Sequence, residues 1–198
     1  MKRALKRLAY LLSILLVLPV WLLYVLESLV LGNERSFSDF SQLMSLFPGI
    51  LGDYLRFGFY KLTLSQLGED TCICFGVTMA NPGIRIGRGV YIGPFCNLGL
   101  CTVEDDVLLA TEVHVMSGFA QHGYETVDTP IREQKGRLLN IRIGADTWVG
   151  NKSVIGSDVA EKCIIGAGSL VNKEIPPYSI AVGNPARVIR DRRLKAGP

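Results

Sequence analysis

The two histidines of this chain are its best candidates for proton-transfer chemistry. His122 precedes Gly123 in a stretch, residues 116–140, that interrupts an otherwise regular sequence, whereas His114 closes a regular unit. A histidine with a pKa near neutrality can take the proton from a hydroxyl that attacks a carbonyl. A long loop leaving a rigid framework is where chemistry is usually found. We therefore interpret His122 as the candidate general base and expect His114 to be an outward surface side chain; purely structural roles for both are the alternative.

Other familiar site chemistries find little support in the sequence. A zinc enzyme built on three histidine ligands is disfavoured because the chain has two histidines. No Walker loop, Gly-x-Gly-x-x-Gly or Gly-x-Ser-x-Gly motif is evident. The five cysteines form no metal-ligand pattern, and Cys72 and Cys74 are too close in sequence for a Cys-x-x-Cys redox pair. We expect no metal, and we interpret Cys163 as a packing residue in a reducing compartment.

The framework that must position the candidate base is a six-residue rhythm between residues 86 and 171. Each unit opens with an aliphatic residue, usually followed by Gly or Ala, and has a small or β-branched residue four places on. The clearest units open at Ile86, Ile92, Val103, Leu109, Ile143, Val149 and Ile165. A period of six is typical of a parallel β-helix, in which short strands bury their aliphatic residues by stacking on neighbouring coils. Neither a helical period of 3.6 nor a strand period of 2 explains it.

An apolar stretch at residues 8–31 precedes the repeat and carries one charge, Glu27. It is long enough to cross a bilayer, which takes about 20 helical residues. Four basic residues come before it: Lys2, Arg3, Lys6 and Arg7. A cleavable signal peptide is the competing interpretation, but the stretch exceeds the usual signal core and no Ala-x-Ala-like site ends it. The sequence therefore predicts a retained membrane helix.

Apolar residues at helical spacing continue from about residue 40 to 62, with a break near Pro48 and Gly49. Two interpretations stay open for this segment. It is either an amphipathic helix pair lying in the membrane interface, or an ordinary helix that caps the end of the solenoid. The predicted organisation is a membrane and interfacial region at 1–68, a β-helix domain at 69–178 with a loop at about 116–140, and a basic tail at 179–198.

Residues from about 69 to 190 resemble the hexapeptide-repeat acyltransferases, a left-handed β-helix family. The likeness is most specific in the His122 loop, in the coils at 143–171 and in the closing segment 181–190, Ala-Val-Gly-Asn-Pro-Ala-Arg-Val-Ile-Arg. It is nearest to the membrane-associated and polysaccharide-related sugar O-acetyltransferases. The implied fold class is mainly β, a left-handed parallel β-helix with an N-terminal α-helical membrane segment. The implied assembly is a homotrimer that binds acetyl-CoA between adjacent subunits, with His122 as general base.

The resemblance also implies roles for individual positions. Asn97 would hold the acceptor hydroxyl, unless it is an internal asparagine stacked in a turn, and Trp148 would line the cleft, unless it is a trimer contact. The positions that match the acetyl-CoA site are Asn151, Ala167, Asn172, Lys173, Arg187 and Arg190. The basic ones suit phosphate groups, although they could instead be solvated charges. The units that open at Val149 and Ile165 are 16 residues apart, where three intact units would give about 18, which predicts a local irregularity of the coil near 154–159.

The implied activity is O-acetyl transfer from acetyl-CoA to a hydroxyl of a sugar on a membrane-linked glycan or polysaccharide precursor. The alternatives are a non-enzymatic membrane-anchored scaffold, or an acyltransferase for a lipid or another small hydroxyl or amine acceptor. The formal net charge of +3 gives no case for nucleic acid.

The cytoplasmic location of acetyl-CoA decides on which side of the membrane the solenoid is expected. A basic N-terminus favours the cytoplasm, so a single pass would carry the solenoid away from cytoplasmic acetyl-CoA. We expect the chain to turn back at Pro19, to re-enter after Phe37, or to hold its helix tilted in one leaflet. Each of these leaves the catalytic domain facing the cytoplasm at a bacterial-type inner membrane.

Overall fold

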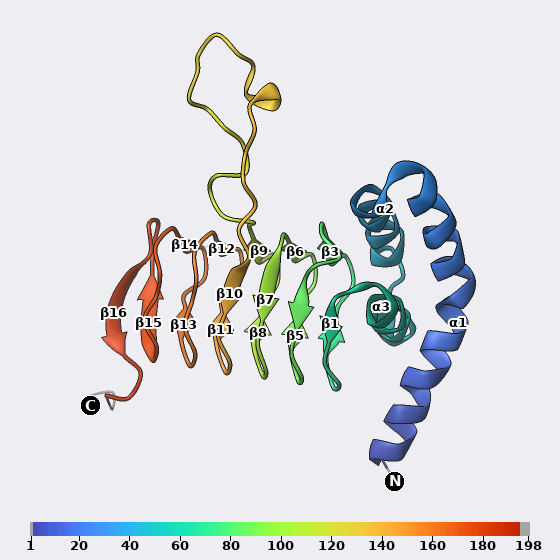
Figure 1. Cartoon of the computed structure of the whole chain (residues 1–198). Helices are drawn as coiled ribbons and strands as arrows, with labels where there is room; N and C mark the ends of the chain where they lie inside the picture. Colours follow the sequence, from blue (N-terminus) through green and yellow to red (C-terminus); the bar gives the residue numbers. More distant parts are fainter. Residues whose placement is uncertain (1, 195–198) are drawn as a thin grey trace.

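The computed structural model describes residues 2–194 and shows a column of parallel coils closed at one end by three helices (Figure 1). The helices are α1 (Lys2–Leu31), α2 (Asn33–Ser45) and α3 (Gly49–Thr63). They lie at the N-terminal end of the column, and the antiparallel pair β15–β16 lies at the other end. A single 3₁₀ turn, η1 (Ile131–Glu133), occurs in the loop that leaves the middle of the column.

The coils form a prism with three flat faces, each a parallel sheet. Face A consists of β1 (Gln66–Leu67), β4 (Arg85–Ile86), β7 (Cys101–Val103) and β10 (Ile141–Ile143). Face B consists of β2 (Cys72–Ile73), β5 (Tyr91–Ile92), β8 (Leu108–Leu109), β11 (Trp148–Val149), β13 (Ile164–Ile165), β15 (Ser179–Val182) and the antiparallel β16 (Arg187–Asp191). Face C consists of β3 (Thr78–Met79), β6 (Asn97–Leu98), β9 (His114–Val115), β12 (Val154–Ile155) and β14 (Leu170–Val171).

The six-residue rhythm is the inner lining of this prism. All seven aliphatic residues that open the clearest units are at most 1% exposed, and most of the residues before them point outward. Cys163, at a small position of the repeat, is fully buried. The structure therefore confirms the predicted fold class, a mainly β parallel β-helix with an N-terminal α-helical segment. The short stretch after β12 is irregular as expected, since Val159 makes only isolated bridges to Ile143 and Ile175.

The limits of the coils differ somewhat from the predicted ones. The first strand begins at Gln66, and β15 pairs in parallel with β13 up to Ala181. Residues 179–182 thus belong to the last coil, and β16 then folds back onto β15 as an antiparallel strand. The described part of the segment that the sequence assigns to a basic tail is therefore largely part of face B.

The helices α2 and α3 cap the solenoid, as one of the two interpretations of this segment predicts. The Ser41 hydroxyl accepts a hydrogen bond from the Met79 N–H at 2.8 Å and is 2.7 Å from the Tyr60 hydroxyl. All three residues are at most 1% exposed, and burial raises the pKa of Tyr60 to about 12. Because these bonds tie both helices to the first coil, their inner faces cannot face lipid.

Arg56 is the polar centre of the cap and is completely buried. Its Nε donates to the Ile73 carbonyl at 2.8 Å, and its Nη1 donates to the carbonyls of Phe47 at 2.5 Å and Met44 at 3.4 Å. Its Nη2 lies 2.6 Å from the Asp53 carboxylate. One guanidinium therefore joins α2, α3 and the first coil, using the planar fork of donors that distinguishes Arg from Lys.

The first helix lies outermost and packs on α3. The approach is close at Gly58, where a Cβ would lie 2.7 Å from the Ser13 carbonyl oxygen. The helix runs without interruption through Pro19, so the chain does not turn back there as one expectation had it. Re-entry after Phe37 is likewise not observed, because α2 lies on the cap. By length and composition residues 8–31 could cross a membrane, which is a weak indication because signal sequences and buried core helices share that property.

Candidate active site

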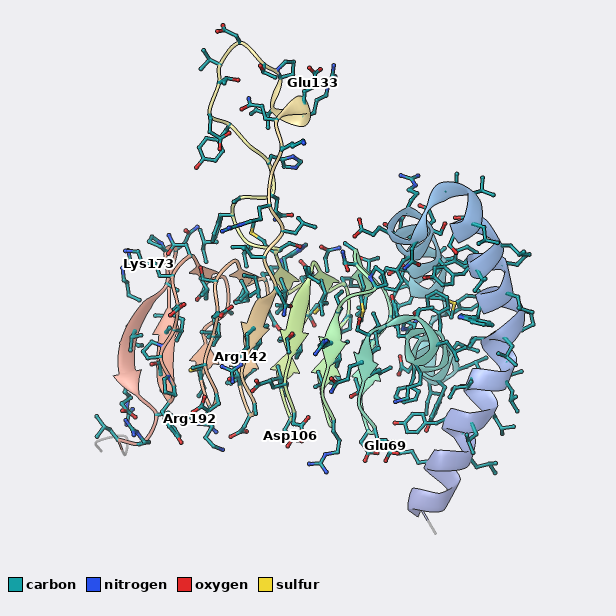
Figure 2. The ribbon with its side chains drawn as sticks, in the orientation of Figure 1. Glu69, Asp106, Glu133, Arg142, Lys173 and Arg192 are labelled. Carbon is teal, nitrogen blue, oxygen red and sulfur yellow. The ribbon has the colours of Figure 1, made fainter. Side chains whose placement is uncertain are left out.

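The interruption of the repeat is a loop that leaves the edge between faces C and A. It begins after β9 and ends before β10, as the sequence predicts, and it projects well away from the prism with Glu133 near its tip (Figure 2). The opposite edge, between faces A and B, is marked by Asp106 and Arg192. The loop does not fold over the faces of its own prism, so it is available to a neighbouring molecule.

Main-chain contacts hold the neck of the loop. The Leu139 N–H donates to the Ser117 carbonyl at 2.8 Å and the Arg137 N–H donates to the Ala120 carbonyl at 2.6 Å. Gly136 lies directly against the backbone of Gln121, where any side chain would collide. These contacts make the neck a paired segment of defined direction rather than a free coil.

The root of the loop is fastened to the coils on either side. The Leu100 N–H donates to the Ser117 hydroxyl at 2.8 Å, which fixes the loop to the preceding coil. The Phe119 ring lies over Gly156 of the following coil, in the space that a Cβ at residue 156 would occupy. Chain connectivity and these contacts thus set where the neck begins on the C–A edge.

His122 lies in this neck with an exposed imidazole. Its backbone is held by Gly136, which packs against its N–H, while the ring has no hydrogen-bond partner among the residues that the structure describes. The backbone is therefore positioned and the ring is accessible to a substrate. A neutral imidazole in that position can accept a proton.

Face C is the floor beside the loop. Asn97 and His114 are paired in register on β6 and β9, and both side chains are exposed on its outer surface. The Asn97 amide donates to the Thr78 hydroxyl at 2.8 Å. Asn97 is thus an outward strand residue, which excludes the alternative of an asparagine stacked inside a turn. His114 points outward as expected, but its place beside Asn97 depends on strand register and was not foreseen.

Five of the six positions matched to acetyl-CoA lie along the two edges that border face C, and Arg190 lies on face B. Asn151 and Ala167 occupy successive turns of the B–C edge, where the Gly168 N–H donates to the Asn151 carbonyl at 2.8 Å. Arg187 begins β16 opposite Val182 at the same edge. All three matched residues are exposed.

The remaining matched residues lie on the C–A edge and on face B. Asn172 and Lys173 follow β14 on the C–A edge, and Figure 2 shows Lys173 on the same side of the prism as the loop. Arg190 pairs with Ile180, farther along face B. Within one chain the predicted donor residues therefore occupy both borders of face C and do not enclose a cavity.

Trp148 stands apart from this group, on face B. Its side chain is 50% exposed and is in register with Leu108, which is in turn in register with Tyr91. The two neighbours are 42% and 41% exposed, so the three form an apolar column across successive coils. The structure does not bring Trp148 together with Asn97, because the two lie on different faces.

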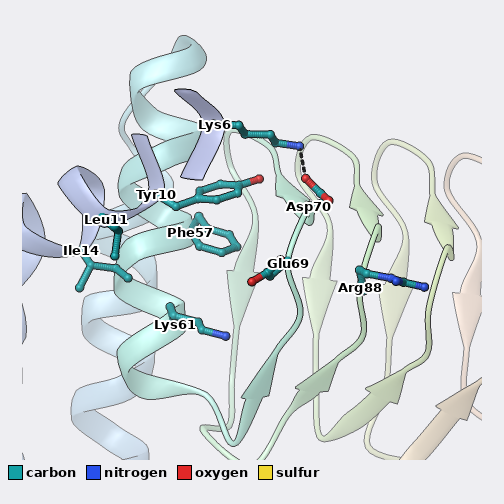
Figure 3. A pocket seen from close by; sticks show the side chains of 9 residues that line it. All are labelled: Lys6, Tyr10, Leu11, Ile14, Phe57, Lys61, Glu69, Asp70 and Arg88. Atoms are coloured by element: carbon teal, nitrogen blue, oxygen red, sulfur yellow. Dashed lines mark ion pairs between the residues drawn. The ribbon is translucent and has the colours of Figure 1, made fainter. Parts of the chain in front are cut away.

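A cavity at the helical end of the column is remote from these positions. It has a volume of about 620 Å³ and lies between α1, α3 and the first two coils (Figure 3). Tyr10, Phe57 and Lys61 form its helical wall, with Asp70 and Arg88 opposite. It contains none of the predicted site residues. No group of three His, Cys, Asp or Glu side chains in residues 2–194 is arranged to hold a metal ion.

The cysteines are free thiols among the described residues. Cys72 and Cys74 have their sulfurs 4.0 Å apart, and the hydrogen bond between them lowers the pKa of Cys74 to about 7 and raises that of Cys72. Cys163 donates to the Pro176 carbonyl at 3.1 Å inside the solenoid. Its role is packing, as predicted.

Comparisons with known proteins agree with this geometry. No family model matches the chain. The galactoside O-acetyltransferase of Escherichia coli is 36% identical over 118 residues, which is 54% of each chain. Among solved structures, a maltose O-acetyltransferase from Clostridium difficile shares the fold with a TM-score of 0.66 at 22% identity, over 82% of this chain and 88% of that one. A galactoside acetyltransferase in complex with coenzyme A gives a TM-score of 0.61 at 25% identity, over 80% of this chain and 82% of that one.

The matches cover different shares of the chains that are compared. The chain spans between 36% and 54% of the length of the curated relatives that it matches. The solved structures cover the larger part of it. What the solved structures share with it is the overall fold, with TM-scores of 0.66 and 0.61. In sequence and in fold the chain is therefore similar to acetyltransferases built on the hexapeptide-repeat β-helix.

Proposed function

We propose that this protein is an O-acetyltransferase that moves an acetyl group from acetyl-CoA to a hydroxyl of a sugar. The single observation that carries the proposal is the fastened loop, which holds an accessible histidine at one border of a face whose two borders carry the donor-type positions. The relatives named as sugar O-acetyltransferases support the reaction class. The solved galactoside enzyme with bound coenzyme A supports the donor.

In the proposed reaction the acceptor oxygen attacks the thioester carbonyl while His122 accepts its proton. The new bond joins oxygen to the acetyl carbon, and the carbon–sulfur bond breaks in return. The proton on the imidazolium then passes to the departing thiolate, which leaves as CoA. Asn97 would orient the acceptor hydroxyl through its exposed amide. Lys173, Arg187 and Arg190 would meet the phosphates of CoA, and the backbone at Asn151 and Ala167 would meet the pantetheine arm.

The acceptor that we propose is a membrane-linked glycan or polysaccharide precursor, which would assign the enzyme to polysaccharide biosynthesis. The basis is the apolar N-terminal helix, which would localise the enzyme at an inner membrane with the solenoid on the cytoplasmic side. A glycan on a lipid carrier and cytoplasmic acetyl-CoA would then meet at one surface. A lipid or an amine acceptor would use the same proton transfer, so the acceptor is decided by assay.

A non-enzymatic scaffold is the competing class, and ligand binding separates it from an enzyme. Acetyl-CoA is expected to raise the melting temperature of the full-length protein in detergent, because a ligand that binds only the native state stabilises it. At a concentration of 100 times the Kd the gain is about 2.7 kcal/mol. Dephospho-CoA is the matched control and should give a smaller shift if the cations bind phosphate. If neither compound raises the melting temperature and no acetyl transfer to any sugar, lipid or amine is found, the non-enzymatic scaffold is the function that the results support.

We also propose that the enzyme is a homotrimer with sites between subunits. The loop rises away from its own face C, so that face stays open unless a neighbour covers it. The apolar column of Tyr91, Leu108 and Trp148 on face B is a surface that a neighbouring subunit could cover. Closed rings of identical subunits are the usual outcome of such head-to-tail contacts.

Subunit mixing tests this assembly. Inactive His122→Ala protein mixed with inactive Arg187→Ala protein is expected to regain activity after subunit exchange, since some interfaces would combine the two intact residues. The same mixture without exchange serves as the control. A fully active preparation whose detergent-corrected mass equals one subunit would contradict the trimer and the shared site.

A further inference from the structure

The outer face of α1 is apolar from Leu8 to Val30. Its exposed residues recur at intervals of three and four, which places them on one side of the helix. They are Leu8, Leu11, Leu12, Leu15, Leu16, Pro19, Leu22, Leu23, Leu26, Leu29 and Val30, here called the leucine stripe. The opposite side, with Ser13, Val17 and Tyr24, is buried. Only 11% of the most apolar window is buried, so α1 is not a core helix.

The leucine stripe is too large and too uniform for a surface in water. The outer side of a soluble amphipathic helix carries polar residues, whereas this stripe contains none, and Glu27 lies off it, half-buried. Soluble monomers rarely expose apolar patches beyond a few hundred Å². Something apolar must therefore cover the stripe.

The helix that carries the stripe is built into the cap along its length. Gly58 sets the close contact of α3 with α1 at Ser13, and Tyr24 donates a hydrogen bond to Asn33 near the far end. At the near end the Lys6 ammonium lies 2.7 Å from the Asp70 carboxylate of the first coil. Figure 1 shows α1 as the outermost element, running across the direction in which the coils are stacked.

This attachment decides how a bilayer could meet the helix. If α1 crossed the bilayer with the cap in place, the part of the cap beside it would enter the hydrocarbon. That part includes Asp53 and Lys61 of α3 and the charged turn at Asp70. Charged groups at that depth are costly, and irregular backbone is not tolerated against lipid. A helix lying in the membrane plane exposes only the stripe to lipid.

We propose that α1 lies in the plane of one leaflet with the leucine stripe toward the acyl chains, so that the solenoid stands away from the membrane with β16 farthest from it. The inference deepens the membrane location proposed above and rests on it. The partner is a bilayer that contains anionic lipid, because Lys2, Arg3, Lys6 and Arg7 cluster at the start of α1 and its first turn has no acidic residue.

The orientation has a consequence for the acceptor. Two helix layers at about 10 Å each and three coils at about 4.8 Å each would hold the His122 loop roughly 34 Å from the acyl chains. A hydroxyl in the headgroup of a lipid cannot reach that height. A sugar several residues out along a lipid-linked glycan can.

Depth measurement on the full-length protein tests the orientation. Single cysteines replace Leu11, Leu15, Leu22 and Leu26 in a Cys72→Ser/Cys74→Ser background and receive nitroxide labels. The protein is bound to vesicles of phosphatidylethanolamine and phosphatidylglycerol, and collision with oxygen and with a nickel chelate gives the depth of each label. We expect one shallow depth at all four positions. A crossing helix would place the outer pair, about 22 Å apart along the axis, near the two headgroup layers and the inner pair near the bilayer centre, which would overturn the proposal.

A charge substitution supplies the second readout. Leu15→Glu/Leu22→Glu protein is expected to stay in the supernatant when vesicles are sedimented and to keep its CoA-induced thermal shift. The matched control is Leu194→Glu, which changes a side chain that is 64% exposed at the other end of the chain, and it should sediment with the vesicles. If wild-type protein never binds vesicles, the proposed membrane location is wrong. If the oligomeric mass of the protein falls on Leu15→Glu/Leu22→Glu substitution, the stripe is instead covered by a second copy of the chain. If binding occurs with a crossing depth profile, only the in-plane orientation fails.

Discussion

Replacement of His122 by alanine is expected to lower acetyl transfer by about 10²–10⁴-fold, the usual contribution of a general base. The imidazole is exposed in the neck of the loop, and residue 122 packs against Gly136 through its backbone. Its loss should therefore leave the fold and CoA binding intact. The measurement is steady-state transfer to the best sugar acceptor, together with the CoA-induced shift in melting temperature. The loss should appear in kcat, because the proton moves only as the new bond forms.

His114→Ala is the matched control, since it removes the other imidazole of the chain from an exposed position on β9. It should retain transfer within a few-fold of wild type. Comparison of the two variants shows which of the two imidazoles acts as the general base. Near-normal turnover of the His122→Ala protein would contradict the proposed base. A large loss in His114→Ala alone would move that role to face C, where His114 lies beside Asn97.

The sequence predicted the parts of this protein that depend on local periodicity. The aliphatic residues of the hexapeptide units had to face inward, because only stacking on neighbouring coils could bury them. Their burial, the position of the loop and the N-terminal helix are found where expected. The likeness to hexapeptide-repeat acyltransferases also predicted the fold correctly, and the relatives found are acetyltransferases.

Features that depend on contacts distant in sequence were not predictable. Nothing near Arg56 indicates that it reaches the Ile73 carbonyl of the first coil, so the capping role of α2 and α3 stayed one of two possibilities. The pairing of Asn97 with His114 arises from strand register across one coil, which the repeat length fixes only once the strand ends are known. The faces that hold Asn97 and Trp148 also depend on that register. The roles of these residues and of the donor-type positions stay predictions.

Removal of the Arg56 side chain is expected to be the most destabilising single change in the cap. Arg56→Ala would delete the donors to the carbonyls of Ile73, Phe47 and Met44 and leave the Asp53 carboxylate without its partner. Leaving one buried carbonyl unpaired typically costs about 1–3 kcal/mol, and three carbonyls lose a donor here. We expect a decrease of that size in the free energy of unfolding, measured by chemical denaturation in detergent.

Two further variants separate the network from charge alone. Arg35→Ala removes an exposed pair with Asp39, whose side chains are 72% and 35% exposed, and should change stability by less than about 1 kcal/mol. Arg56→Lys keeps the charge but replaces the planar fork by a single ammonium, which cannot serve α2, α3 and the first coil together. It should therefore lose a large part of what Arg56→Ala loses. If Arg56→Lys were as stable as wild type, charge alone would suffice, and the fork of hydrogen bonds would not be what holds the helices on the solenoid.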